Sequence, residues 1–214
     1  KSAAFLDPGQ GGKGKTAIIF AVKNTAMETL FILASFFLLV FGLLGVYDGF
    51  YLHLWKFELH ARPESKFEHL THTLRAVLFP LIIACLFVPH PSEAMFYLGL
   101  FFLLADVVVL AFDAWLETDS RKFMGGLPRW EYMLHLIVNG FHFSTVALLL
   151  AAKMDFQGAV PKLRTDVQDV WSAKLFFAIA FNLLPGALLI ALLHVGLMTR
   201  QGKTMWVRLR TRLG

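Results

Sequence analysis

Two segments of the chain place a carboxylate and an imidazole at the same spacing, a few residues after a proline. Glu68 and His72 are four residues apart, and so are Glu131 and His135. Residues four apart on an α-helix share one face, so each pair offers an oxygen and a nitrogen to the same ligand. Oxygen and imidazole ligands suit iron, manganese or zinc. The spacing therefore indicates a metal or cofactor site.

Further acids and one histidine form similar stripes: three acids on another segment, and His142 on the segment that holds Glu131 and His135. Asp106, Asp113 and Glu117 are separated by seven and four residues, which places them on one stripe of a helix at about 100° per residue. His142 follows His135 by seven residues and continues the second stripe in the same way. Both stripes run along segments that are otherwise strongly apolar, so the polar side chains are expected to face one another.

The composition is that of a membrane protein. Of 214 residues, 57% are hydrophobic, 22 are Phe and only 16% are charged, whereas soluble domains carry about 25% charged residues. A helix needs about 20 mostly apolar residues to cross a bilayer. Five such spans use most of the chain and leave no room for a second soluble domain. We therefore predict an all-α, polytopic membrane helix bundle with about five transmembrane helices.

The apolar runs also predict the domain organisation. An N-terminal polar or interfacial segment covers 1–25, the transmembrane bundle covers 26–199, and a basic amphipathic tail covers 200–214. The predicted spans are 27–57, 63–88, 93–118, 129–153 and 171–199. We expect the first four to form two antiparallel hairpins that are a weak internal repeat, with the fifth helix packed beside them.

An up-and-down order brings the ends of spans one and three and the starts of spans two and four to the same membrane face. The acids and histidines therefore gather at that face. Folding each hairpin about its turn predicts facing pairs: Glu117 with Glu131, Asp113 with His135, Asp106 with His142, Asp48 with His72, and Tyr51 with His69.

Ionisable groups cost a few kcal/mol each inside a bilayer, so they tend to face one another or a cavity. Carboxylates from two helices with Glu and His from two others are the ligand set of di-iron and di-manganese bundles. That architecture uses Glu-x-x-His, whereas this chain has Glu-x-x-x-His. The predicted ligands of one ion or a dinuclear pair are Asp48, Glu68, His72, Asp113, Glu117, Glu131 and His135; the predicted cofactor-binding residues are His142 and Asp106.

Three functions are compatible with such a site. The first is a metal-dependent oxidoreductase or hydroxylase that acts on a lipid-like or quinone-like substrate, with Arg75 orienting it. The second is a haem b- or pigment-binding subunit of a respiratory or photosynthetic complex, with His72 and His135, or His142 alone, as axial ligands. The third is a non-catalytic accessory subunit whose polar cluster holds helices together or carries protons.

Other signals narrow the partners. The single Cys85 excludes a disulfide framework and a cysteine metal cluster. Residues 9–16 fit the phosphate-loop pattern, but that pattern works only between a strand and a helix, so no nucleotide is expected. The excess of Lys and Arg over Asp and Glu is interpreted first as a signal of membrane orientation. No nucleic-acid partner is expected.

The distribution of Lys and Arg predicts the orientation. The face with the polar cluster and the tail holds twelve of these residues, against eight on the other, which favours the first as cytoplasmic. We expect an integral protein of a bacterial inner membrane or an organellar membrane. Its expected partners are the lipid bilayer and other membrane subunits.

Overall fold

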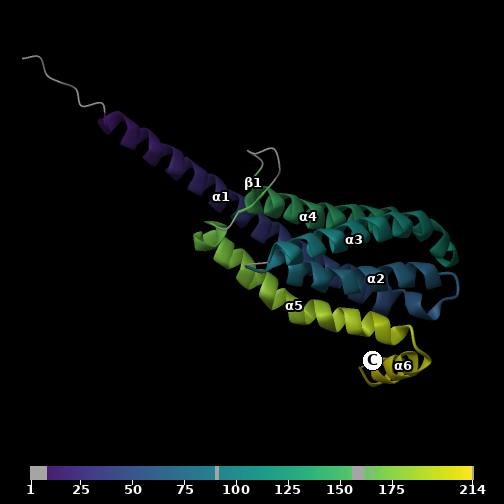
Figure 1. The fold of residues 1–214 in the computed structure, drawn as a ribbon. Coiled ribbons are helices and arrows are strands. Elements are labelled where there is room, and N and C mark those ends of the chain that lie inside the picture. The colour runs from purple at the N-terminus through teal and green to yellow at the C-terminus, as the bar shows by residue number, and fades with distance from the viewer. Residues whose placement is uncertain (1–8, 90–91, 156–161, 165, 214) are drawn as a thin grey trace, which may run out of the picture.

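The computed structural model describes residues 9–89, 92–155, 162–164 and 166–213. Nearly all of them are helical (Figure 1). The elements are α1 (Gly9–Gly45), η1 (Val46–Lys56), η2 (Leu59–Ala61), α2 (Lys66–Ile82), η3 (Ile83–Phe87), α3 (Glu93–Ser120), η4 (Lys122–Met124), α4 (Arg129–Lys153), β1 (Met154–Asp155), β2 (Lys162–Leu163), η5 (Asp166–Asp169), α5 (Trp171–Leu197) and α6 (Arg200–Leu213).

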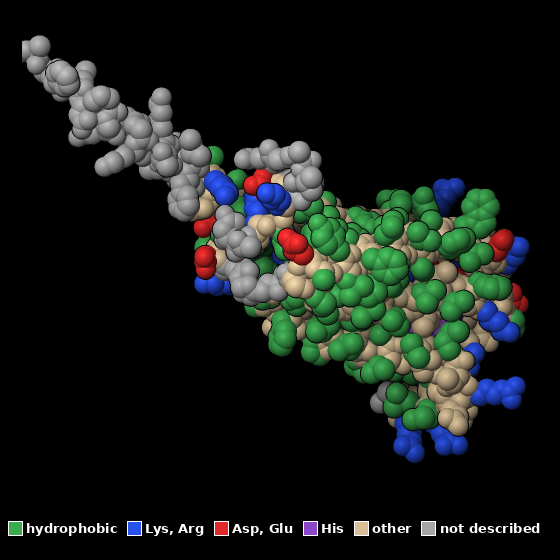
Figure 2. All heavy atoms as spheres, viewed as in Figure 1, with side chains coloured by type: hydrophobic (Ala, Val, Ile, Leu, Met, Phe, Trp, Pro, Cys, Tyr) green, Lys and Arg blue, Asp and Glu red, His purple; other side chains and the backbone are tan. Residues whose placement is uncertain are grey.

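Five helices are long and apolar enough to cross a membrane: Val22–Lys56, Lys66–Phe87, Glu93–Ser120, Arg129–Lys153 and Trp171–Leu197. Large hydrophobic side chains are exposed around them, and they cover the flank of the bundle seen in Figure 2. A protein surface of this kind is matched to lipid rather than to water. The predicted all-α membrane bundle of five spans is confirmed.

The most extensive helix packing does not follow the order of the helices along the chain. Helix α1 packs against α4 and α5, and helix α2 packs against α3 and α5. The helices still alternate in direction along the chain (Figure 1). Contacts between polar residues are therefore expected across the α1–α4 and α2–α3 interfaces, rather than mainly within each hairpin.

Local sequence explains where several helices begin and turn. The Ser92 hydroxyl accepts a hydrogen bond from the Met95 main-chain N–H at 3.2 Å and so caps the first turn of α3. Pro128 immediately precedes α4. Between α3 and α4, Gly125 and Gly126 have φ angles of 83° and 112°, a region in which side chains other than glycine are strained.

The structure gives part of the predicted N-terminal polar or interfacial segment a helical backbone. Helix α1 begins at Gly9 and continues through 9–25 into the first span. The phosphate-loop-like pattern at 9–16 lies inside this helix instead of following a strand. Once a helix is established, each added residue contributes a hydrogen bond at little further cost, so a span can continue beyond the apolar run. The boundary at residue 25 is thus one of composition, not of backbone structure.

Two segments are π-helical. The segment η1 extends the first span through Val46–Lys56, and η3 ends the second span at Ile83–Phe87. Pro80 lies inside α2 just before η3 and supplies no N–H to the helix, which disturbs the local hydrogen bonding. π-Helical turns are rare in proteins as a whole, but those that occur are often found at functional sites. The longer one, η1, carries part of the polar cluster.

A buried lysine forms hydrogen bonds at the end of the bundle that holds η3. The Lys153 ammonium donates to the main-chain oxygens of Leu86 and Val88, and the residue is only 2% exposed. Carbonyls at a helix end have no partner within the helix, so Lys153 joins α4 to the end of the second span. Next to it lies the main hydrophobic core, where the rings of Phe31 and Phe176 are 6.0 Å apart.

Close approach of the second and third spans requires a glycine in α3. A Cβ atom at Gly99 would lie 2.5 Å from Leu86 Cγ and 2.9 Å from Cys85 Cβ. We expect Gly99→Ala to lower the free energy of unfolding by about 1–3 kcal/mol, the usual range for overpacking. Unfolding of the purified protein in mixed micelles would measure this.

Gly140→Ala is the matched control. Among the described residues, no heavy atom lies within 4 Å of a Cβ at Gly140. This substitution should therefore raise stability by the helix preference of alanine, about 0.5–1 kcal/mol. Equal effects of the two substitutions would contradict the packing at Gly99.

Candidate metal centre

The predicted metal ligands gather at one end of the bundle. They come from four membrane-spanning segments: η1 carries Asp48, α2 carries Glu68 and His72, α3 carries Asp113 and Glu117, and α4 carries Glu131 and His135. All five carboxylate residues are buried, and the His72 and His135 side chains are 12% and 13% exposed. The structure thus brings all seven residues into one region.

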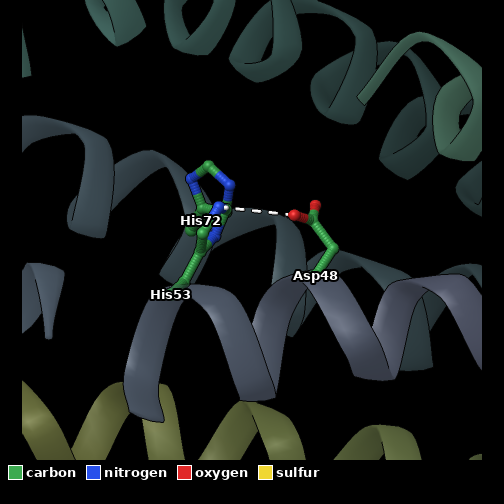
Figure 3. Close-up of side chains that lie close together, drawn as sticks. All are labelled: Asp48, His53 and His72. Carbon is green, nitrogen blue, oxygen red and sulfur yellow. Dashed lines mark ion pairs between the residues drawn. The ribbon is translucent and has the colours of Figure 1, made fainter. Parts of the chain in front are cut away.

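Three histidine rings form the centre of this cluster. The ring centroids of His53 and His72 are 4.0 Å apart, those of His53 and His135 are 5.6 Å apart, and those of His72 and His135 are 6.5 Å apart. His53 is therefore nearer to each of the other two rings than they are to each other. In Figure 3, His53 and Asp48 project from the same helical segment, η1, toward His72.

Two groups of side chains have ligand atoms within 4.8 Å of one another. One contains Asp48, His53 and His72, and the other contains His53, Glu131 and His135. Each group combines imidazole nitrogen with carboxylate oxygen, which is the donor set expected for zinc, iron or manganese. The two groups share His53, so they describe adjoining positions in one centre.

Carboxylates orient two of the rings. Asp113 Oδ1 lies 3.0 Å from His72 Nδ1, and Asp48 Oδ1 lies 3.0 Å from His135 Nε2. Glu117 contacts the other ring nitrogen of His135. Such pairs fix the orientation of an imidazole and increase its basicity, as in metal sites where a carboxylate supports a ligating histidine.

Several ligand atoms in this cluster lack a hydrogen-bond partner among the described residues. They include both ring nitrogens of His53, Glu68 Oε1 and Glu131 Oε2. His53 Nε2 is 3.5 Å from Asp48 Oδ1, without hydrogen-bond geometry. A buried polar atom left unpaired costs about 1–3 kcal/mol. These nitrogens and oxygens are therefore free to act as ligands of a cation.

Arg121 accounts for the remaining oxygens of the two glutamates. Its guanidinium is fully buried and donates to Glu68 Oε2 at 2.7 Å and to Glu131 Oε1 at 2.6 Å and 3.1 Å. Each glutamate thus gives one oxygen to Arg121 and keeps one without a partner. The arginine joins the end of α3 to the starts of α2 and α4, and it partly neutralises the buried negative charge.

A second polar group lies deeper in the bundle. Asp106 Oδ2 is 3.5 Å from His142 Nε2, so the predicted facing of these two residues is confirmed. Arg75 donates to Asp106 Oδ1 at 3.1 Å and to Asn139 Oδ1 at 2.7 Å. The seven residues from Asp113 to Asp106 correspond to about 10 Å along a helix. Arg75 spans this distance, because its Nη1 also lies 4.0 Å from Asp113 Oδ2.

Other predicted pairings are corrected. Asp113 was expected to face His135, but it pairs with His72 across the α2–α3 interface, and His135 pairs with Asp48 across α1–α4. Glu131 was expected to face Glu117, and the structure pairs it with Arg121 instead. The first two changes arise because α1 packs on α4 and α2 packs on α3, so Asp113 and His135 each find a partner in the other hairpin. Glu131 instead pairs with Arg121, which belongs to its own hairpin.

Sequence reasoning missed His53, the residue shared by both ligand groups. It lies five residues after Asp48, which on an α-helix is a rotation of about 500° and places the two on different faces. In the π-helix η1, hydrogen bonds run between residues five apart, so Asp48 and His53 come to the same side. The five-residue spacing was the one available signal, and it has meaning only if a π-helix is expected.

A further three histidines are buried outside the metal centre. The rings of His69 and His194 are 5.4 Å apart, and those of His60 and His69 are 5.9 Å apart. Burial lowers the pKa of His60 from its ordinary value. The predicted facing of His69 with Tyr51 is replaced by this arrangement, and Tyr51 stacks on Tyr47 at the surface.

A cavity of about 180 Å³ adjoins the metal centre. Asp48 and His72 line one end of it, and Arg75, Asp106 and His142 line another part. The remaining wall is mainly apolar and comes from α1, α2, α4 and α5. The centre is therefore open to a space inside the membrane-spanning region.

Comparison with protein-family models, with curated protein sequences and with solved structures gives no match for this chain. The assignment of the site therefore depends on its own geometry and chemistry.

Replacing Arg121 tests the buried charge arrangement. We expect Arg121→Met to lower the free energy of unfolding by about 3–5 kcal/mol, because it leaves Glu68 and Glu131 buried without their cation. The neighbouring Lys122 forms an exposed ion pair with Asp119. Lys122→Met should change stability by less than about 0.5 kcal/mol, as for most surface substitutions. Similar losses for both variants, measured by unfolding in mixed micelles, would contradict this role.

Proposed function

We propose that the chain is an integral membrane metalloprotein whose Glu/Asp/His centre lies near one membrane face, and that it is a metal-dependent oxidoreductase or hydroxylase for a lipid-like or quinone-like substrate. The observation that carries the proposal is the set of unpartnered, buried ligand atoms around His53. A polar network that served only to hold helices together would be expected to satisfy its own hydrogen bonds.

The chain supplies ligands for one ion or for two. Asp48, His53 and His72 form the first position, and His53, Glu131 and His135 form the second. In this assignment, Asp113 and Glu117 orient the imidazoles, and Arg121 holds Glu68 and Glu131 in place. Iron, manganese and zinc all fit these donors, and the absence of sulfur ligands disfavours copper(I).

When bound, iron or manganese would supply activation of oxygen, whereas zinc, which has no redox chemistry, would supply activated water. The protein residues have separate tasks. The carboxylate–histidine pairs keep the rings in position, and the surrounding apolar helices keep bulk water away from the centre. Arg75 lines the adjoining cavity and offers a cation to a polar group of the substrate. The apolar wall of that cavity favours a lipophilic substrate over a soluble metabolite.

The arrangement favours metal ions over haem b. His72 and His135 were the pair considered for axial ligation, but His53 lies nearer to each of these rings than they lie to one another. A flat macrocycle placed between His72 and His135 would have to displace His53. The many carboxylates around the rings also suit a small cation better than a porphyrin face.

Metal analysis of the purified protein tests the proposal. We expect at least one equivalent of iron, manganese or zinc per chain, without a haem absorption band. His53→Ala should lower metal affinity by at least tenfold, because it removes a ligand from both positions. His69→Ala, which removes a buried histidine outside the two ligand groups, should leave the metal content unchanged. Metal-free protein with an intact fold would overturn the assignment.

A further inference from the structure

The cavity beside the metal centre has a polar group at each of two ends. Asp48 and His72, which belong to the first ligand group, line one end. Asp106 and His142 line another part of the wall. These two residues come from α3 and α4 and lie deeper in the bundle. A bound molecule would therefore meet polar atoms from both pairs and from Arg75, together with apolar side chains of the remaining wall.

The deeper polar group is incompletely paired. Asp106 and His142 are 3% and 2% exposed, and Asp106 Oδ2 lies 3.5 Å from His142 Nε2 without hydrogen-bond geometry. Among the described residues, His142 Nδ1 has no hydrogen-bond partner. Arg75 occupies the other oxygen of Asp106. A carboxylate oxygen accepts a hydrogen bond, and a neutral imidazole both donates and accepts. This group can therefore bind a hydroxyl or a carbonyl oxygen.

The volume limits the size of the ligand. An engineered cavity of about 150 Å³ with apolar walls binds benzene, so a cavity of about 180 Å³ holds one six-membered ring with small substituents. A complete acyl chain is too large for this space. The rings of Phe41 and Phe79 are part of the cavity wall, and aromatic rings pack well against such a ligand.

Small residues create the space. Gly45 lines the cavity at the junction of α1 and η1, and a Cβ atom added there would meet its first neighbour, the Phe41 ring, at 4.0 Å. A larger side chain at this position would therefore extend into the cavity without a clash at its Cβ atom.

We propose that the cavity binds a single six-membered ring that carries an oxygen function at each end, the hydroquinone–quinone class. One oxygen is hydrogen-bonded by Asp106 and His142, and the other is directed toward Asp48 and His72. The pair Asp106–His142 accepts from a hydroxyl and donates to a carbonyl, so both oxidation states of the ring are accommodated. This inference rests on the proposed function, because it names the substrate class of the same site.

Ligand binding to the protein in nanodiscs tests this inference. The probes are methylhydroquinone, kept anaerobic, and toluene, which has the same ring and no oxygen. After partition into empty nanodiscs is subtracted, methylhydroquinone should bind at least tenfold more tightly than toluene. His142→Phe should remove this difference while toluene binding is kept. Equal affinity of the wild-type protein for the two probes would overturn the assignment.

Filling the cavity gives an independent arm. Gly45→Leu should weaken the binding of methylhydroquinone at least tenfold, and Gly140→Leu, on an exposed part of α4 outside the cavity, should not. Metal content is measured on the same samples. Retained metal without ring binding would overturn this inference alone, whereas ring binding by a protein that takes no metal would overturn the proposed function alone. Loss of binding in both glycine variants would refute the cavity as the binding place.

Discussion

The polar end of the bundle depends on one buried cation, Arg121. Charges are expensive in a membrane interior unless they are paired, and Glu68 and Glu131 enter the bundle beside three other buried carboxylate residues. Arg121 takes one oxygen from each glutamate and so joins three spans through a single guanidinium. A planar guanidinium can serve two carboxylates at once, whereas the ammonium of lysine acts as a point charge. The remaining carboxylates, with the histidines beside them, are the donors to which we assign a metal ion in the proposed function.

The spans follow directly from physical constraints that act along the sequence. Apolar runs of sufficient length predict the fourth span at Arg129–Lys153, with the same bounds as α4, and Ser92 predicts the start of α3. The gathering of acids and histidines at one end follows from the alternation of helix direction. These properties are local or topological, so a sequence contains enough information to predict them.

Side-chain partners were harder to predict because they depend on which helices touch. Folding each hairpin about its turn placed Asp106 opposite His142 correctly, deep in the bundle. The same procedure paired His135 with Asp113, whereas the structure pairs it with Asp48. No pattern along the chain reveals that α1 packs on α4 and α2 on α3. His53 was missed for a different reason: the π-helical backbone of η1 changes which residues share a face. Assigning residues to a helix face from their spacing assumes the α-helical period of about 3.6 residues per turn. The π-helix η1 does not follow this period.

The interlocked packing also has a consequence for how the protein is made. The first ligand group comes from the first two spans alone, because it contains Asp48, His53 and His72. The second group takes His53 from the first span and Glu131 and His135 from the fourth. During synthesis, the first two spans emerge with three of these ligands, but their positioning partners on α3 and α4 follow later. A metal ion captured at that stage would lack Glu131 and His135. Under the proposed function, the complete centre would form only after the fourth span has inserted, and metal acquisition would be a late event in the assembly of this protein.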